Sequence, residues 1–296
     1  MTFLLDVIKG IFIGVANIIP GVSGGTMAVS LGIYDKLIAS LSGFTKDWKK
    51  SVKTLLPIVL GCAIGLIAFA YVIEYLLSRH TFLTCMTFIG LILGGLPVLI
   101  RSLKKKLTDK KRKLSFGNFV SFLIFFGIVI LLPMMKGQAD PLAVLTVTPV
   151  TLLILFFVGI IASATMVIPG VSGSMVMMIL GYYYGIINTL KGFFDALKAF
   201  DINGVLSASI VLVPFGIGVL LGIFLIAKAI DYLFKKHSII TYCSILGLIF
   251  ASPFAIIYNT GMWKQLSSLS VTSVIAGFFL CGISGVITYF LGGKEG

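Results

Sequence analysis

Long apolar runs, separated by short polar segments, recur along the whole chain. Six of these runs carry almost no charge and are long enough to cross a bilayer as helices, which takes about 20 residues. They cover residues 55–77, 82–100, 116–135, 205–227, 239–258 and 271–291. Because their length and continuous apolar character do not fit the short alternating strands of an outer-membrane barrel, the pattern predicts an all-α polytopic membrane protein.

Two further apolar stretches, residues 3–42 and 150–190, are each interrupted near the middle by the sequence Pro-Gly-Val-Ser-Gly. Proline lacks an N–H and glycine weakens a helix, so each stretch is expected to form a broken helical hairpin. Each arm has enough residues to cross the membrane, which leaves a fully spanning hairpin open. Irregular backbone at membrane depth is tolerated where protein or a polar cavity covers it, and this favours re-entrant hairpins.

Charged residues make up only 11% of the chain, and its net charge is +13. Such an excess could indicate nucleic-acid binding, but it is concentrated in short loops, with eight Lys and Arg within residues 101–113 and four within residues 46–53. The positive-inside rule places both loops in the cytoplasm. Threading the spans between them also places residues 235–236 and both termini there. We therefore expect a protein of the cytoplasmic (inner) membrane and no nucleic-acid partner.

No metal or other cofactor is expected. The four cysteines, Cys62, Cys85, Cys243 and Cys281, all lie within predicted spans and lack the spacing of a metal site. Buried cysteine usually behaves as a small apolar residue.

The second half of the chain repeats the first. Residues 19–24 and 168–173 both read Ile-Pro-Gly-Val-Ser-Gly, and later matches include His80 with His237. The repeats cover residues 1–140 and 141–296, each one interrupted segment followed by three spans. If the interrupted segment enters and leaves on one side, each repeat crosses three times and the second is inverted. Inverted repeats with broken helices are typical of secondary transporters, whose substrate sites lie near the midplane between repeats.

Each break is followed by a serine, a favoured helix N-cap. A restarting helix directs free N–H groups and the positive end of its dipole toward the break, where an anion can bind, and glycine lets the anion approach. The dipole supplies only about 0.3–2 kcal/mol, so hydroxyl groups and a cation are also needed. The predicted phosphate-binding residues are Asn17, Gly21, Ser23, Gly24, Gly25, Thr26, Gly170, Ser172, Gly173 and Ser174, with Arg79 and then Lys36 as cations.

Two of these interpretations have simpler alternatives. The repeated motif also fits a structural role, in which it shapes two tightly packed hairpins and backbone groups satisfy its hydroxyls. Glu74 and Asp231 are candidates for ion coupling, but each lies near a span end, where a local ion pair with a neighbouring basic residue is the favoured explanation. The small residues Gly61 and Gly65, with their counterparts Gly218 and Gly222, indicate close helix packing.

Residues 17–26, which read Asn-Ile-Ile-Pro-Gly-Val-Ser-Gly-Gly-Thr, and their partial copy at residues 168–174 resemble the bacterial polyprenyl-phosphate transporter family. The similarity covers nearly the whole chain. It implies a non-enzymatic translocase that returns undecaprenyl phosphate, the lipid carrier of cell-wall precursors, from the outer to the cytoplasmic leaflet. The implied partners are this lipid and other membrane lipids, and a homo-oligomer is compatible with the sequence. Ser174 stands where the first copy has Gly25, so the two loops need not contribute equally.

The sharpest rival is an enzyme, because polyprenyl-diphosphate phosphatases of another membrane family also have inverted repeats and a Pro-Gly-x-Ser-Arg-Ser-Gly loop. Here Gly24 and Gly173 occupy the arginine position, and the only glutamates are Glu74 and Glu295. The chain therefore lacks the general acid or base and the charge clamp that phosphoryl chemistry needs. The third interpretation is a membrane scaffold that transports nothing, for which the polar loop residues are dispensable.

Overall fold

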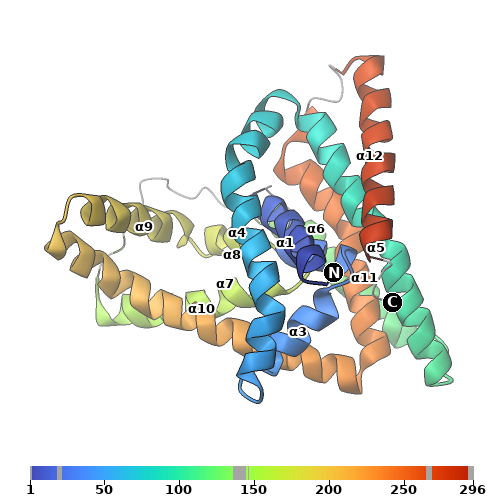
Figure 1. Cartoon of the computed structure of the whole chain (residues 1–296), viewed down its shortest axis with the longest axis horizontal. Coiled ribbons are helices and arrows are strands. Elements are labelled where there is room, and N and C mark those ends of the chain that lie inside the picture. The colour runs from blue at the N-terminus through green and yellow to red at the C-terminus, as the bar shows by residue number, and fades with distance from the viewer. Residues whose placement is uncertain (1, 19–21, 136–144, 146, 265–268, 293–296) are drawn as a thin grey trace. The chain divides into compact units, whose positions relative to one another are not determined.

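The computed structural model describes residues 2–18, 22–135, 145, 147–264 and 269–292 (Figure 1). Over these residues the chain is helical and forms no strand. The first half contains α1 (Thr2–Ile18), α2 (Gly24–Ser30), α3 (Tyr34–Ser42), α4 (Trp48–Arg79), α5 (Thr81–Asp109) and α6 (Phe116–Met134). The second contains α7 (Pro149–Val167), α8 (Gly173–Ile179), α9 (Tyr183–Lys198), α10 (Ile202–Lys236), α11 (Ser238–Asn259) and α12 (Val271–Gly292). Both halves therefore have the same order of helices.

All six predicted spans are helices, which confirms a polytopic helical membrane protein. Within the described residues, seven helices are long and apolar enough to cross a membrane, and the seventh is α7, the first arm of the second broken hairpin. Several helices extend past the predicted spans. α5, for example, continues through the basic segment to Asp109, because helical hydrogen bonding persists after the apolar run ends.

Each broken hairpin has a second interruption in addition to the predicted one. Gly32 and Gly181 have φ values of 72° and 81°, a left-handed conformation that glycine adopts without the strain a side chain causes. Equivalent backbone hydrogen bonds close both turns. In the first, the N–H of Ile33 donates to the carbonyl oxygen of Ala28, and in the second, the N–H of Tyr182 donates to that of Met177, both at 3.0 Å. The second arm is thus two helices, α2 with α3 and α8 with α9.

The chain folds into two compact units that cut across the sequence repeats. Unit 1 comprises Met1–Pro133, Ile168–Val171 and Ala227–Gly296, and unit 2 comprises Met134–Val167 and Ser172–Ile226. Unit 1 thus combines the first repeat with the tip of the second loop and with α11 and α12, which pack against α5.

Glycines set the closest helix contacts in unit 1. A Cβ at Gly61 or Gly65 of α4 would collide with backbone carbonyls of α1, and one at Gly94 of α5 would collide with α12. One at Gly247 of α11 would collide with the carbonyl of Phe122 in α6. Such close approach confirms the packing role predicted for the first pair.

Unit 2 repeats the packing scheme of α1 and α4 with α7 and α10. A Cβ at Gly218 of α10 would collide with the carbonyl of Phe156 in α7. The core of this unit is an apolar cluster of Leu155, Val158, Ile186 and Val211.

Candidate functional site

The first Pro-Gly-Val-Ser-Gly loop joins α1 to the start of α2. Ser23 is the N-cap of α2, as predicted, and its Oγ accepts a hydrogen bond from the N–H of Gly25 at 3.2 Å. Asn17, at the end of α1, accepts a hydrogen bond through Oδ1 from the N–H of Gly24 at 3.1 Å. Two donors at the start of α2 therefore already have side-chain partners. Gly21 lies outside the described residues.

The loops of the two halves touch each other within unit 1. The N–H of Gly170 donates a hydrogen bond to Oγ1 of Thr26, with 2.6 Å between the two atoms. Thr26 is fully buried. Gly170 has a φ of 80°, and a Cβ there would press on the backbone of Leu248 in α11. The structure thus brings together one predicted site residue from each copy of the motif.

The start of α8, in unit 2, differs from the start of α2. Ser172 is in the N-cap position, but its side chain makes no capping hydrogen bond. Its Oγ lies 2.9 Å from the Oγ of Ser174 instead. Two hydroxyls that share one hydrogen bond retain one O–H able to donate elsewhere. Gly173 is buried at the first position of α8.

α2 is held firmly although it is only seven residues long. Six of its residues are buried, and Ser30 at its end donates a hydrogen bond to the carbonyl oxygen of Ile92 in α5 at 3.2 Å. A Cβ at Gly95 of α5 would collide with Ser30. α2 therefore lies inside unit 1, against the middle of α5.

Lys36, the second predicted cation, forms an ion pair that the sequence analysis missed. Its Nζ donates to both carboxylate oxygens of Asp6 in α1, at 3.0 and 2.8 Å. Asp6 is buried, and about a third of the Lys36 side chain is exposed. Another charged residue of α1, Lys9, is fully buried. Charged residues inside an apolar segment are usually functional or paired, and this signal would have drawn attention to both.

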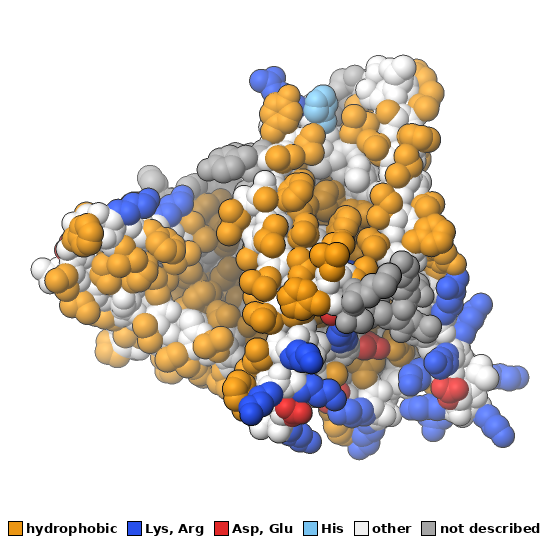
Figure 2. All heavy atoms as spheres, in the orientation of Figure 1, with side chains coloured by type: hydrophobic (Ala, Val, Ile, Leu, Met, Phe, Trp, Pro, Cys, Tyr) orange, Lys and Arg blue, Asp and Glu red, His pale blue; other side chains and the backbone are white. Residues whose placement is uncertain are grey.

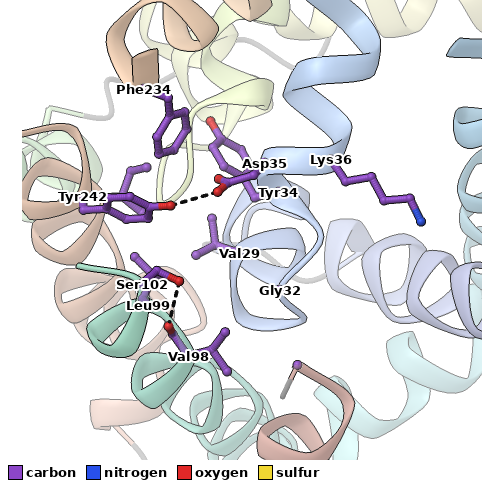
Figure 3. A pocket seen from close by; sticks show the side chains of 12 residues that line it. Val29, Gly32, Tyr34, Asp35, Lys36, Val98, Leu99, Ser102, Phe234 and Tyr242 are labelled. Carbon is purple, nitrogen blue, oxygen red and sulfur yellow. Dashed lines mark hydrogen bonds between the residues drawn. The ribbon is translucent and has the colours of Figure 1, made fainter. Parts of the chain in front are cut away.

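A cavity of about 220 Å³ lies beside the start of α3 (Figure 3). Asp35 in α3 accepts a hydrogen bond from the hydroxyl of Tyr242 in α11 at 2.9 Å. Ser102 in α5 lines the same cavity, and its Oγ donates to the carbonyl oxygen of Val98. Lys36 also lines it, but Figure 3 shows its ammonium directed away from Asp35 and Tyr242. The cavity is therefore bordered by residues from both sequence repeats.

The remaining predicted residues lie elsewhere. Arg79, the first predicted cation, is exposed at the end of α4. The next residue, His80, lines a separate, mostly apolar cavity of about 520 Å³ formed by α1, α4, α5 and α12.

Asp231 accepts a hydrogen bond from Lys235, with 2.6 Å between the atoms, so the local ion pair is present. The side chain of Glu74 lies outside the described residues. Within the described residues, no group of three or more His, Cys, Asp or Glu could hold a metal ion.

The sequence of the chain matches a family model described as VCA0040-like, undecaprenyl phosphate translocase-like, over residues 13–275. The chain belongs to this family. The match includes both Pro-Gly-Val-Ser-Gly loops, and it confirms the family that residues 17–26 predicted.

Two curated relatives of the chain are named polyprenyl-phosphate transporter. The one from Staphylococcus aureus is 31% identical over 291 residues, which cover 96% of each chain. The one from Vibrio cholerae serotype O1 is 26% identical over 287 residues, which cover 92% of this chain and 82% of the relative. No solved structure matches the chain.

Proposed function

We propose that this protein moves a polyprenyl monophosphate, undecaprenyl phosphate in bacteria, from the outer to the inner leaflet of the cytoplasmic membrane. Its membership of the translocase-like family supports this proposal, as do the names of the two relatives. The polyprenyl tail can stay in the bilayer while the charged headgroup crosses. The protein therefore has to shelter only one phosphate group from the apolar core.

We propose that the two repeated loops hold this headgroup. In the first loop, Asn17 and Ser23 occupy the N–H groups of Gly24 and Gly25. Buried N–H groups without partners are costly, so these side chains keep the loop stable when it is empty. An arriving phosphate would displace them, accept hydrogen bonds from the same N–H groups and accept another from the released hydroxyl of Ser23. In the second loop, Ser172 and Ser174 share one hydrogen bond, and the O–H that this bond does not use would donate to the phosphate.

The contact between Thr26 and Gly170 supports a mechanism in which both loops take part. It joins the motif of one repeat to the motif of the other through a buried hydrogen bond. Alternating access moves one repeat against the other around a fixed site, and this contact would couple the two motifs during such a movement. A movement of α2 would be transmitted directly to the second loop.

The decisive experiment places the purified protein in liposomes and follows labelled undecaprenyl phosphate between leaflets, with and without ion gradients. We expect the protein to change the leaflet distribution of the label. No change under any gradient would refute transport. Release of phosphate from undecaprenyl diphosphate would instead identify a phosphatase.

A second experiment tests the loops directly by measuring headgroup binding in the double variant Ser23→Ala/Ser172→Ala. We expect weaker binding by a folded protein, because hydroxyls from both loops are lost. Undiminished binding would leave the motif a packing role only. A scaffold would tolerate both substitutions without loss of its cellular role.

A further inference from the structure

Unit 1 has a second polar cavity, far along the sequence from the loops, with a volume of about 330 Å³. It lies between the turn after α5, the start of α6 and the start of α11. Four basic residues line it, namely Lys110, Arg112, Lys113 and Lys236. No acidic residue is among the described residues that line it. Figure 2 shows Lys and Arg side chains gathered along the lower edge of the molecule, where hydrophobic side chains give way to charged ones.

The turn after α5 brings these basic residues back toward the helix starts. Lys111 has a φ of 48°, in the left-handed region. The N–H of Arg112 donates to the carbonyl oxygen of Leu107 at 3.0 Å, and the N–H of Lys111 donates to that of Thr108. This is the hydrogen-bond pattern in which helices usually end on glycine. A lysine in this conformation costs about 1–2 kcal/mol, and the turn places its neighbours Lys110 and Arg112 at the cavity.

Two helices begin at the cavity. α11, which is 22 residues long, starts at Ser238, and its N-cap residue His237 makes no side-chain capping bond. α6 starts next to Ser115, and both Ser115 and Asn118 line the cavity. Helix starts carry partial positive charge and unpaired N–H groups. These add to the field of the four basic side chains.

Ser238 supplies an independent indication that a ligand binds. The residue lines the cavity and is only 2% exposed, yet its Oγ has no hydrogen-bond partner among the described residues. Leaving a buried hydroxyl unsatisfied is unfavourable, and such groups usually have a partner that is a protein group, a water or an ion. An anion bound in the cavity would accept this hydrogen bond.

We propose that this cavity is a binding site for a phosphomonoester, either inorganic phosphate or the phosphate of a lipid headgroup. A phosphate near neutral pH carries about −1.5 to −2 charges and three strong acceptor oxygens, which match the four basic residues, the helix starts and Ser238. Basic loops often serve only to orient a membrane protein. A lined cavity with a buried, unpartnered hydroxyl goes beyond that role.

The position of the site deepens the proposed function, on which this step rests. The positive-inside rule assigns the turn after α5 and the start of α11 to the cytoplasmic face, and the cavity shows that the two lie side by side. A polyprenyl phosphate that has crossed would present its headgroup at this face. The cavity would hold it in the inner leaflet and oppose its return.

The test measures the binding of inorganic phosphate and, separately, of undecaprenyl phosphate by the full-length protein in nanodiscs of uncharged lipid. The triple variant Arg112→Gln/Lys113→Gln/Lys236→Gln removes three charges from the cavity. The control Lys46→Gln/Lys49→Gln/Lys50→Gln removes three charges from the other basic loop. Since charge-assisted hydrogen bonds are the strong ones, we expect the cavity variant to bind phosphate at least about tenfold more weakly and the control to change by less than about twofold.

Ser238→Ala provides a test that leaves the charge, and hence the membrane orientation, unchanged. We expect it to weaken binding by about tenfold to 150-fold, the contribution of one hydrogen bond to a charged group. If the triple variant fails to fold, this single variant decides the outcome. Unchanged binding in Ser238→Ala would then overturn the proposal, as would an equal loss in the control triple variant.

The two ligands distinguish the source of the phosphate. Loss of undecaprenyl phosphate binding, with or without loss of inorganic phosphate binding, assigns the cavity to the lipid headgroup. Loss of inorganic phosphate binding alone assigns it to free phosphate. Translocation is measured separately in liposomes. A protein that moved no lipid but still bound phosphate through Ser238 would refute the proposed function and leave this site standing.

Discussion

Replacing Thr26 with valine tests the contact between the two loops with little change in shape. Valine has nearly the volume of threonine and keeps both branches at Cβ, but it has no oxygen. The N–H of Gly170 would lose the acceptor that now lies 2.6 Å away. Because Thr26 is fully buried, water cannot easily take its place.

The magnitude follows from the cost of an unsatisfied buried donor. That cost is about 1–3 kcal/mol, which corresponds to a factor of roughly 5–150 in an equilibrium constant. Thr26→Ser keeps the oxygen and loses one methyl group, worth about 0.8 kcal/mol. The valine variant should therefore be the more damaging one, although it removes less volume.

Leaflet exchange of labelled undecaprenyl phosphate and thermal unfolding are the measurements for this prediction. We expect Thr26→Val to slow exchange and lower the unfolding temperature, and Thr26→Ser to retain most of both. Thr189→Val is the matched control, because the hydroxyl of Thr189 donates to the carbonyl of Gly185 in its own helix and to no other helix among the described residues. Equal exchange by the valine and serine variants at position 26 would show that the hydrogen bond does not join the loops functionally.

Three further predictions concern stability. Ser23→Ala removes the cap of α2 and should lower the free energy of unfolding by about 1 kcal/mol in denaturant unfolding. Ser172→Ala should cost less, because the side chain of Ser172 makes no capping hydrogen bond; equal costs would contradict this. Gly61→Ala should destabilise by about 1–3 kcal/mol because its Cβ meets α1, whereas Gly127→Ala should not, because its Cβ would meet no described atom within 4 Å beyond its own turn of helix. Asp6→Asn should lower the unfolding temperature, and adding Lys36→Met should restore part of the loss; a purely additive double variant would argue against coupling.

Features set by local sequence were predictable. Continuous apolar runs identified the spans, and the proline and glycine of each motif identified the predicted helix breaks. The sequence predicts Ser23 as an N-cap because a capping side chain accepts a hydrogen bond from the first turn of the helix that follows it. The packing of Gly61 was predicted because small residues at this spacing let two backbones approach.

Pairings between distant residues were not predictable from one sequence. The sequence suggests Lys36 as a cation for the headgroup, but in the structure it pairs with Asp6, which lies 30 positions away. The bond between Asp35 and Tyr242 spans 207 positions. The sequence around these residues does not indicate their partners, because only tertiary packing brings each pair together. The extra breaks are different: they were not predicted, although Gly32 and Gly181 occupy matching positions of the two repeats and both adopt the left-handed conformation.

The difference between the two loops follows from a single position of the repeat. In the first loop the residue two after the N-cap serine is Gly25, which has no side chain, and the serine hydroxyl turns to its N–H. In the second loop that residue is Ser174, whose hydroxyl lies beside Ser172 and takes the place of the cap. A start of α8 without a serine cap costs stability that the first loop retains. Under the proposed function the cost has a use, because the first loop must release Asn17 and Ser23 before its N–H groups can bind phosphate. The second loop holds a hydroxyl ready to donate, so it would bind the headgroup without such a release.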